Sequence, residues 1–215
     1  MSATVAIIDY GSGNLASAAK ALERAATDAA TGQRVLVTAR AEDIATAERI
    51  VLPGVGAFAD CMQGLSNLPG MLDALKDAVV KQARPFLGIC VGMQLMAARG
   101  LEHGEHKGFG WIPGDVVKLT PAGALKVPHM GWNAIHIQKP APALEGIPEG
   151  SNFYFVHSYY PIPENAEIVA TTTDYGIEFA SSIGQEKLFA CQFHPEKSQA
   201  FGLQILKNFG RLVHA

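Results

Sequence analysis

Cysteine is scarce in this 215-residue sequence, and the three cysteines form no recognisable pattern. Cys61, Cys90 and Cys191 are an odd number and include no CxxC pair, which argues against a disulfide framework and against a cysteine-based zinc site. We therefore expect a protein of the reducing cytoplasm.

Charge and long apolar runs are also limited. The 17 Lys and Arg against 20 Asp and Glu leave a net charge of −3, so the basic surface of a nucleic-acid-binding protein is not expected. Gly, Pro or charged residues interrupt every apolar run before the ~20 residues that a membrane-spanning helix requires. The first residues, MSATVAIIDYGSG, lack a basic segment and include Asp9, so they do not resemble a signal peptide.

Apolar residues, in contrast, make up 48% of the chain, which is ample for a hydrophobic core and excludes a disordered protein. The length suits one large domain better than two small ones. We therefore expect a single domain over residues 1–215.

The first half of the sequence alternates between apolar strand patterns and helical patterns. We expect strands at 4–9, 35–38, 49–52 and 85–89. We expect helices at 15–26, from the segment PGVGAF to about residue 82, and from Cys90 to about residue 98. Strand, loop and helix in repetition predict right-handed βαβ units and a parallel sheet.

The second half contains short strand patterns spaced by about ten residues, which predict antiparallel strands. These patterns are DVVKL, NAIHI, NFYFV, EIVATTT, EFASSI and LFACQF, and a helix at 199–213 follows them. The expected fold is α/β, with one open, doubly wound, mostly parallel sheet of the flavodoxin-like type and antiparallel strands added in the C-terminal half. In such sheets the functional site lies beyond the carboxyl ends of the parallel strands. The segments YGSGN and PGVGAF and the turn at Cys90 meet this condition.

The segment GICVG at 88–92 predicts a nucleophile. An apolar strand leads into Cys90 and a helical pattern leaves it, as in the nucleophile elbow of hydrolases. Gly88 and Gly92 permit a tight turn, and a helix N-terminus favours the thiolate form of the cysteine. The same segment is also compatible with a buried structural cysteine in a strand–helix turn.

His194 is the best candidate base for Cys90. It follows an apolar strand, and Pro195 favours an extended backbone at His194, so that Glu196 points to the same side as His194. Together these residues supply a nucleophile, a base and a group that orients the base. Without Cys90, the segment HPE would indicate only an ordinary turn at the end of a strand.

Backbone N–H groups of two loops are expected to stabilise an oxyanion. The segment PGVG at 53–56 ends an apolar strand, and its glycines allow a peptide to turn and point an N–H toward the developing charge. Val91, directly after the nucleophile, supplies the second donor. Among other residues, Met93 and Met96 are expected in the core, whereas His129 and His157 suit either a structural place or a place near the site.

Several segments together resemble the class I glutamine amidotransferases. They are IDYGSGNL, LPGVGAF, GICVGMQL, PHMGWN, FVHSYY and QFHPEKS, which extend from the first strand to the last helix. IDYGSGNL and PHMGWN resemble one branch of that family, the glutaminase subunits of imidazole glycerol phosphate synthase in histidine biosynthesis.

The resemblance implies a reaction and a partner. Cys90 attacks the side-chain amide of L-glutamine, His194 protonates the leaving ammonia, and water hydrolyses the thioester to glutamate, with no metal and no organic cofactor. The resemblance also implies that the N–H groups of Gly56 and Val91 serve the oxyanion and that Gln94, Ser158 and Tyr159 contact the substrate. A (β/α)8-barrel cyclase subunit receives the ammonia in a heterodimer. The expected contacts of this partner are Ser12, Asn14, Trp132, Tyr154 and Lys197.

Three alternatives remain open at this stage. The chain suits the glutaminase subunit of another pathway, such as anthranilate or aminodeoxychorismate synthesis, although PHMGWN and IDYGSGNL favour the first branch. A stand-alone cysteine hydrolase of γ-glutamyl or peptide substrates would turn over without a partner. A non-catalytic subunit has no chemical need for Cys90, His194 and Glu196 together.

Overall fold

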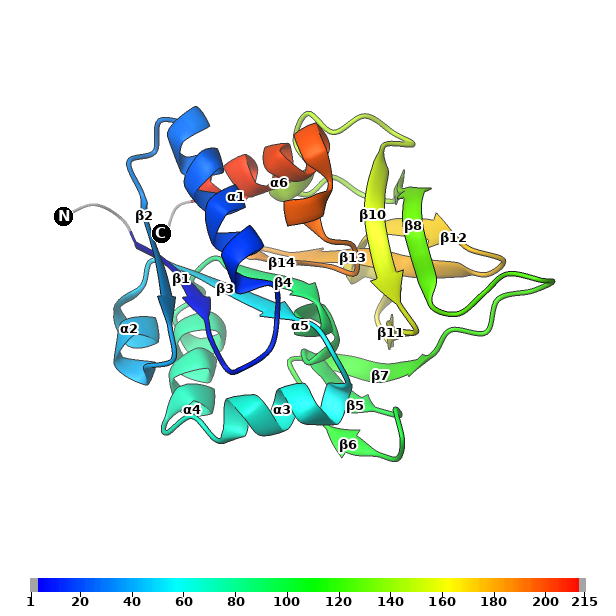
Figure 1. Cartoon of the computed structure of the whole chain (residues 1–215), viewed down its shortest axis with the longest axis horizontal. Helices are drawn as coiled ribbons and strands as arrows, with labels where there is room; N and C mark the ends of the chain where they lie inside the picture. The colour runs from blue at the N-terminus through cyan, green and yellow to red at the C-terminus, as the bar shows by residue number, and fades with distance from the viewer. Residues whose placement is uncertain (1–3, 213–215) are drawn as a thin grey trace.

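A central sheet of eight strands organises the chain, which we describe from a computed structural model over residues 4–212 (Figure 1). The strand order is β2-β1-β3-β4-β14-β13-β12-β9, and the first five strands are mutually parallel. These five are β1 (Thr4–Ile8), β2 (Arg34–Thr38), β3 (Arg49–Gly54), β4 (Phe86–Cys90) and β14 (Leu188–Cys191). Their order is that of flavodoxin-like sheets, so the expected fold class is confirmed.

Helices cover both faces of this sheet (Figure 1). The helices α1 (Leu15–Asp28) and α6 (Gln199–Arg211) pack together on one face. On the opposite face lie α2 (Ala41–Thr46), α3 (Phe58–Ser66) and α4 (Met71–Leu75), which continues as a π-helix over Lys76–Lys81. Strands β3 and β4 lie between these layers and are buried along their whole length, as their apolar sequences predict. The expected end of the last helix at residue 213 lies outside the described residues.

The C-terminal half adds antiparallel strands, but only some of them join the central sheet. The strands β13 (Glu178–Gln185), β12 (Val169–Asp174) and β9 (His136–Ile137) extend it beyond β14. Two small sheets hold the rest. One pairs β8 (His129–Ala134) with β10 (Asn152–His157), and the other has the order β11-β7-β5-β6. The strands of the latter are β5 (Ala97–Gly100), β6 (His106–Lys107), β7 (Ile112–Lys118) and β11 (Tyr159–Pro163). The segments DVVKL and NFYFV therefore form separate sheets rather than a continuation of the central one.

Two expected helices differ from the structure. The helix after Cys90, expected to reach residue 98, is only α5 (Val91–Gln94). The following carbonyls accept hydrogen bonds from another segment: Phe109 N–H donates to Leu95 O at 2.8 Å, and Ile112 N–H donates to Met96 O at 3.0 Å. The helical stretch expected up to residue 82 is divided, because Gly70 adopts a left-handed conformation with φ of 72°. Short 3₁₀ turns complete the chain at Pro142–Leu144, Ala166–Ile168 and Pro195–Lys197.

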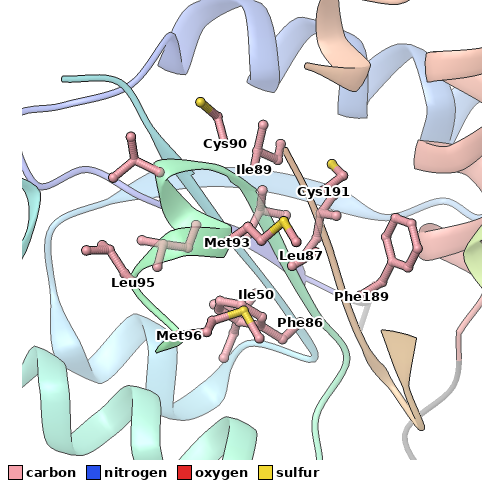
Figure 2. Packing of buried hydrophobic residues seen from close by; sticks show 14 of the residues in the cluster. Ile50, Phe86, Leu87, Ile89, Cys90, Met93, Leu95, Met96, Phe189 and Cys191 are labelled. Atoms are coloured by element: carbon pink, nitrogen blue, oxygen red, sulfur yellow. The ribbon is translucent and has the colours of Figure 1, made fainter. Parts of the chain in front are cut away.

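A continuous hydrophobic core fills the space between the layers. Met93 and Met96 are 1% and 0% exposed, which confirms that both belong to the core. Figure 2 shows Cys90 at the edge of this cluster, with Met93 and Met96 packed further inside. Within residues 4–212, no helix is both long and apolar enough to traverse a bilayer.

Candidate active site

Cys90 stands on a turn that only glycine neighbours permit. Its own backbone has a φ of 54°, in the left-handed region that a residue with a side chain adopts only under constraint. A Cβ atom at Gly92 would lie 1.9 Å from Leu52 O, and one at Gly88 would lie 2.9 Å from Gly92 O. The expected strand–elbow geometry is therefore confirmed, and close packing against β3 is its cause.

The sulfur of Cys90 has two polar contacts beyond the histidine that faces it. Val156 O, on β10, lies 3.8 Å from the sulfur and can accept a hydrogen bond from the thiol. Gln192 Nε2 donates to the sulfur at 3.5 Å. Since α5 is a single turn, its dipole is weaker than that of the longer helix expected from the sequence. These two contacts and His194 are therefore the polar groups beside the thiol.

His194 and Glu196 form a buried pair. The two side chains are 2% and 3% exposed, and His194 Nδ1 lies 2.8 Å from Glu196 Oε1. The backbone holds the histidine in place, because its N–H donates to Tyr154 O at 2.8 Å and its carbonyl accepts from Ser198 Oγ at 2.6 Å. His194 Nε2 is buried with no nitrogen or oxygen partner among the described residues. That nitrogen is available to exchange a proton with Cys90.

The charge on His194 is set by two opposing effects. Burial alone lowers the pKa of His194, but the hydrogen bonds and charges of Cys90 and Glu196 outweigh burial and raise the pKa to about 10. Glu196 thus stabilises the protonated form of the His194 imidazole. The raised pKa favours the protonated imidazole, which carries a donor on the side of the ring facing Cys90.

A cavity of about 260 Å³ opens beside the sulfur. It is smaller than a site for a drug-sized ligand and suits a small metabolite. Seven of the residues expected to act on the substrate line it: Gly56, Cys90, Val91, Gln94, Ser158, Tyr159 and His194. The structure thus gathers them from four segments that are far apart in the sequence.

The segment PGVG borders this cavity with its glycine in an unusual conformation. Gly56 has a φ of 114°, which a residue with a Cβ adopts only with strain. Val55 N–H donates to Ser12 Oγ at 3.3 Å, and Tyr10 Oη donates to Pro53 O at 2.7 Å. The first loop of the chain therefore holds the loop that is expected to carry an oxyanion donor.

Comparison with known proteins decides the family. The model of "Glutamine amidotransferase class-I" matches residues 6–212. The chain belongs to the class I glutamine amidotransferases. It is 53% identical over 209 residues to the protein named imidazole glycerol phosphate synthase subunit HisH of Brucella suis, covering 95% of this chain and 97% of that relative. It is 54% identical over 211 residues to the protein of the same name from Rhizobium meliloti, covering 96% of this chain and 98% of that relative.

Solved structures support the fold. A crystal structure from Thermoplasma acidophilum, described as part of a putative GMP synthase, has a TM-score of 0.68 at 19% identity, covering 98% of this chain and 93% of that one. A structure described as a glutamine amidotransferase also has a TM-score of 0.68, at 18% identity, covering 96% of this chain and 98% of that one. At such identities the likeness concerns the fold alone. Among residues 4–212 of this amidotransferase, no three His, Cys, Asp or Glu side chains are grouped so as to hold a metal ion.

Two buried histidines lie behind the cavity, His129 on β8 and His157 opposite it on β10. Tyr159 O can only accept, so His157 Nδ1, at 3.0 Å from it, carries a proton. His157 Nε2 then accepts from His129 Nδ1 at 3.0 Å, and His129 Nε2 accepts from Asn133 Nδ2 at 3.3 Å. Both rings are neutral in this arrangement, and burial lowers the pKa of His129 to about 4 and that of His157 to about 3.

The neutral histidines make the fold sensitive to acid. Below pH ~6.5 these histidines become protonated in the unfolded chain but stay neutral in the folded chain. The free energy of unfolding should therefore fall as pH falls from 6.5 to about 5. For His157 alone the loss should reach about 2 kcal/mol at pH 5. His194 contributes in the opposite direction but weakly, because its raised pKa keeps it protonated in the folded chain while the unfolded chain completes its protonation between pH 6.5 and 5. Urea unfolding at several pH values should show that the free energy of unfolding of His157→Gln depends less on pH than that of the wild type. His103→Asn, at an exposed loop position, is the control, and an unchanged slope for His157→Gln would contradict the assignment.

Two residues of the site were not singled out by the sequence analysis. Gln192 is part of the segment QFHPE, but nothing local indicated that its amide reaches the sulfur of Cys90. Glu102 lines the cavity, and its Oε2 accepts from Phe58 N–H, at the start of α3, at 2.8 Å. Nothing in the sequence around Glu102 indicates that a glutamate of this loop lines the cavity.

The five residues expected to contact a partner fall into two groups. Trp132 and Tyr154 pair directly across β8 and β10 with ring centroids 6.0 Å apart, and Lys197 Nζ lies 5.8 Å from the centre of the Tyr154 ring. Ser12 is engaged with Val55 as described above, and Asn14 precedes α1 without capping it through its side chain. The first group is close to His194, whose N–H is bonded to Tyr154 O.

Proposed function

We propose that this chain is the glutaminase subunit of an imidazole glycerol phosphate synthase and hydrolyses L-glutamine to glutamate and ammonia. The observation that carries the proposal is the buried Cys90–His194–Glu196 arrangement on a cavity for a small metabolite. The named relatives at 53–54% identity support the choice of pathway over anthranilate or aminodeoxychorismate synthesis. We infer that residues 1–215 act as one amidotransferase domain in the cytoplasm, which agrees with three unpaired thiols.

The reaction begins with the proton of the Cys90 thiol already on His194 Nε2, as the raised pKa of His194 favours, and the sulfur attacks the side-chain amide carbon of glutamine. The new carbon–sulfur bond places negative charge on the amide oxygen. His194 then gives its proton to the departing nitrogen, the carbon–nitrogen bond breaks, and ammonia leaves a γ-glutamyl thioester. Water, deprotonated by His194, attacks the thioester and releases glutamate, and the thiolate recovers the proton. Glu196 holds the ring and stabilises its charged form throughout.

Residues around the cavity have distinct parts in this scheme. The backbone N–H groups of Gly56 and Val91 donate to the oxyanion. Gln94 Nε2 donates to Tyr159 O at 2.9 Å and to Gln192 Oε1 at 3.1 Å. The Oε1 atom of Gln94 is left to accept a hydrogen bond from the substrate. Ser158 and Tyr159, which also line the cavity, bind the amino-acid end of glutamine together with Gln94.

Ammonia then passes to a cyclase with a (β/α)8-barrel fold, which forms a heterodimer with this chain. The cyclase uses the ammonia to form imidazole glycerol phosphate and aminoimidazole carboxamide ribotide. The proposed contact surface includes Trp132, which is 49% exposed, and Met130 on the same face of β8, which is 61% exposed. Such an exposed aromatic and apolar pair, next to Tyr154 and Lys197, suits a protein interface. Ser12 and Asn14, on the loop before α1, are proposed as a second group of partner contacts.

The test is ammonia release from glutamine by the chain alone and with the cyclase and its nucleotide ligand. The isolated chain should be slow, because PGVG is held by Ser12 and Tyr10, and the partner should raise the rate. Gly56→Pro removes an N–H and imposes a negative φ, so it should lower the stimulated rate by about 10²–10³-fold and the basal rate much less.

Gly56→Ala is the matched control for this experiment. It keeps the N–H, and its Cβ meets no atom within 4 Å, so only the strain of a positive φ remains. Its stimulated rate should exceed that of Gly56→Pro by at least about tenfold. Equal proportional losses of basal and stimulated rates in Gly56→Pro would contradict the oxyanion part of the proposal. A chain that releases no ammonia in either state would contradict the function itself.

A further inference from the structure

Gln192 occupies a wholly buried position between β14 and the catalytic histidine. Its backbone N–H donates to Ser181 O on the neighbouring strand β13 at 2.9 Å, so the chain here still follows the sheet. Its side chain reaches Cys90, 102 residues earlier in the sequence, with Nε2 3.5 Å from the sulfur. Gln192 does not line the cavity, so the reaction scheme above gives it no part.

The hydrogen bonds leave one orientation for this amide. Tyr159 O can only accept, so the Gln94 group 2.9 Å from it is the donor Nε2. The same Gln94 Nε2 lies 3.1 Å from Gln192 and must face an acceptor there, which is Oε1. Gln192 Nε2 is therefore turned toward the sulfur of Cys90. A backbone carbonyl thus determines, through two amides, that a donor faces the nucleophile.

A hydrogen-bond donor beside the Cys90 sulfur stabilises the thiolate form of the cysteine more than the thiol form. Val156 O can only accept, so its contact at 3.8 Å stabilises the thiol. Gln192 Nε2 can only donate, and a hydrogen bond to a charged acceptor is about twice as strong as one to a neutral acceptor. We propose that Gln192 is a positioning residue that holds the Cys90 sulfur and stabilises its thiolate. The proposal rests on the glutaminase function above, in which Cys90 is the nucleophile.

Other ionisable groups also face the sulfur from the elements around it. These ionisable groups are His194 and Glu196 after β14, Tyr10 after β1, Cys61 on α3, Cys191 on β14, and His157 and Glu102, which line the cavity. None of them is bonded to Gln192 by its side chain. A substitution of Gln192 that removes the donor to the Cys90 sulfur therefore leaves these ionisable groups in place.

Gln192→Met is the variant that tests the proposal, because it keeps the length of the side chain and removes the donor. Gln94 Nε2 retains Tyr159 O as the partner of one of its two N–H groups, and the second loses Gln192 Oε1, a loss that Gln192→Glu below avoids because its carboxylate still accepts. The readout is the rate of alkylation of Cys90 by iodoacetamide in the full-length chain, followed by mass spectrometry from pH 5 to 10. The pH of half-maximal rate should rise by about one unit. In the complex, kcat for glutamine at neutral pH should fall by about tenfold with little change in KM.

Two further variants make the result decisive. Ser181→Ala removes a buried hydroxyl on the adjacent strand, where Thr171 keeps Ser182 as a partner, so its alkylation profile should match that of the wild type. Should Gln192→Met fail to fold, Gln192→Glu carries the same test, because its carboxylate accepts from Gln94 but cannot donate to the thiolate. It should raise the half-maximal pH at least as much.

Superimposable alkylation profiles for the wild type and the folded Gln192 variant would overturn the proposal, whatever the activity. A loss of activity with an unchanged profile would assign Gln192 a merely structural part. The failure of the glutaminase function is separately visible. In that case the wild type releases no ammonia from glutamine with the cyclase present, while the alkylation profile still measures the link between Gln192 and Cys90.

Discussion

Replacing Cys90 by serine should abolish glutamine-dependent synthesis in the complex while leaving synthesis from added ammonium intact. Serine has nearly the same shape as cysteine on the elbow. Its hydroxyl is far less acidic than a thiol, however, and forms little alkoxide with His194 as the base. We expect the glutaminase rate to fall by at least about 10⁴-fold. The cyclase chemistry belongs to the partner and needs only ammonia, so the ammonium-dependent rate serves as the internal control.

The matched control for this experiment is Cys61→Ser. Cys61 is also buried, and it lies near Ser12 and Val55 under the PGVG segment, but it does not line the cavity. This variant should retain most of the glutamine-dependent rate. Glutamine use by Cys90→Ser at a rate close to that of the wild type would remove Cys90 from the role of nucleophile.

Changes at His194 and Glu196 should separate the base from the group that orients it. His194→Asn should nearly eliminate turnover at saturating glutamine, because the same ring acts first as base and then as acid. Asparagine is a better choice than alanine here, since its amide can donate to Glu196, whereas alanine would leave a carboxylate that is 3% exposed without its partner.

Glu196→Gln should be less damaging, with a loss in kcat of about 10²-fold. The base remains, but the negative charge that helps to raise the pKa of His194 is gone, so that pKa should fall from its raised value of about 10. Comparing kcat across pH for both variants tests this assignment. If Glu196→Gln proves worse than His194→Asn, the two roles are wrongly assigned.

Much of the fold and of the site could be predicted because the signals are local. The elbow depends on Gly88 and Gly92, two residues before and two after Cys90, and the structure shows that both are required by contacts within a few residues or with the next strand. The pair of His194 and Glu196 depends on the alternation of an extended backbone, which Pro195 enforces. Apolar runs such as RIVLP predicted strands buried on both faces.

The failures concern segments whose neighbours in space are remote in sequence. Residues 95–98 follow a helical pattern, yet their carbonyls accept hydrogen bonds from residues 108–112, and tertiary pairing outweighs helix propensity there. The strand pattern of NFYFV agreed with β10, but its pairing with β8 in a separate sheet depends on a partner about twenty residues away. Pairing of this kind is selected by packing and not by periodicity.

The sequence by itself determined the fold class, the parallel order of the early strands and the residue types that the chemistry requires, because short-range periodicity, glycine spacing and proline act on the backbone directly. Only the tertiary structure decided which side chains share the cavity and how they are oriented. The insertion of β14 beside β4 brings Gln192 and His194 to Cys90, and the bonds from Tyr159 O through Gln94 to Gln192 set the direction of each amide. Such contacts form only when strands about a hundred residues apart lie side by side, since the direction of a hydrogen bond depends on the partner's position in space.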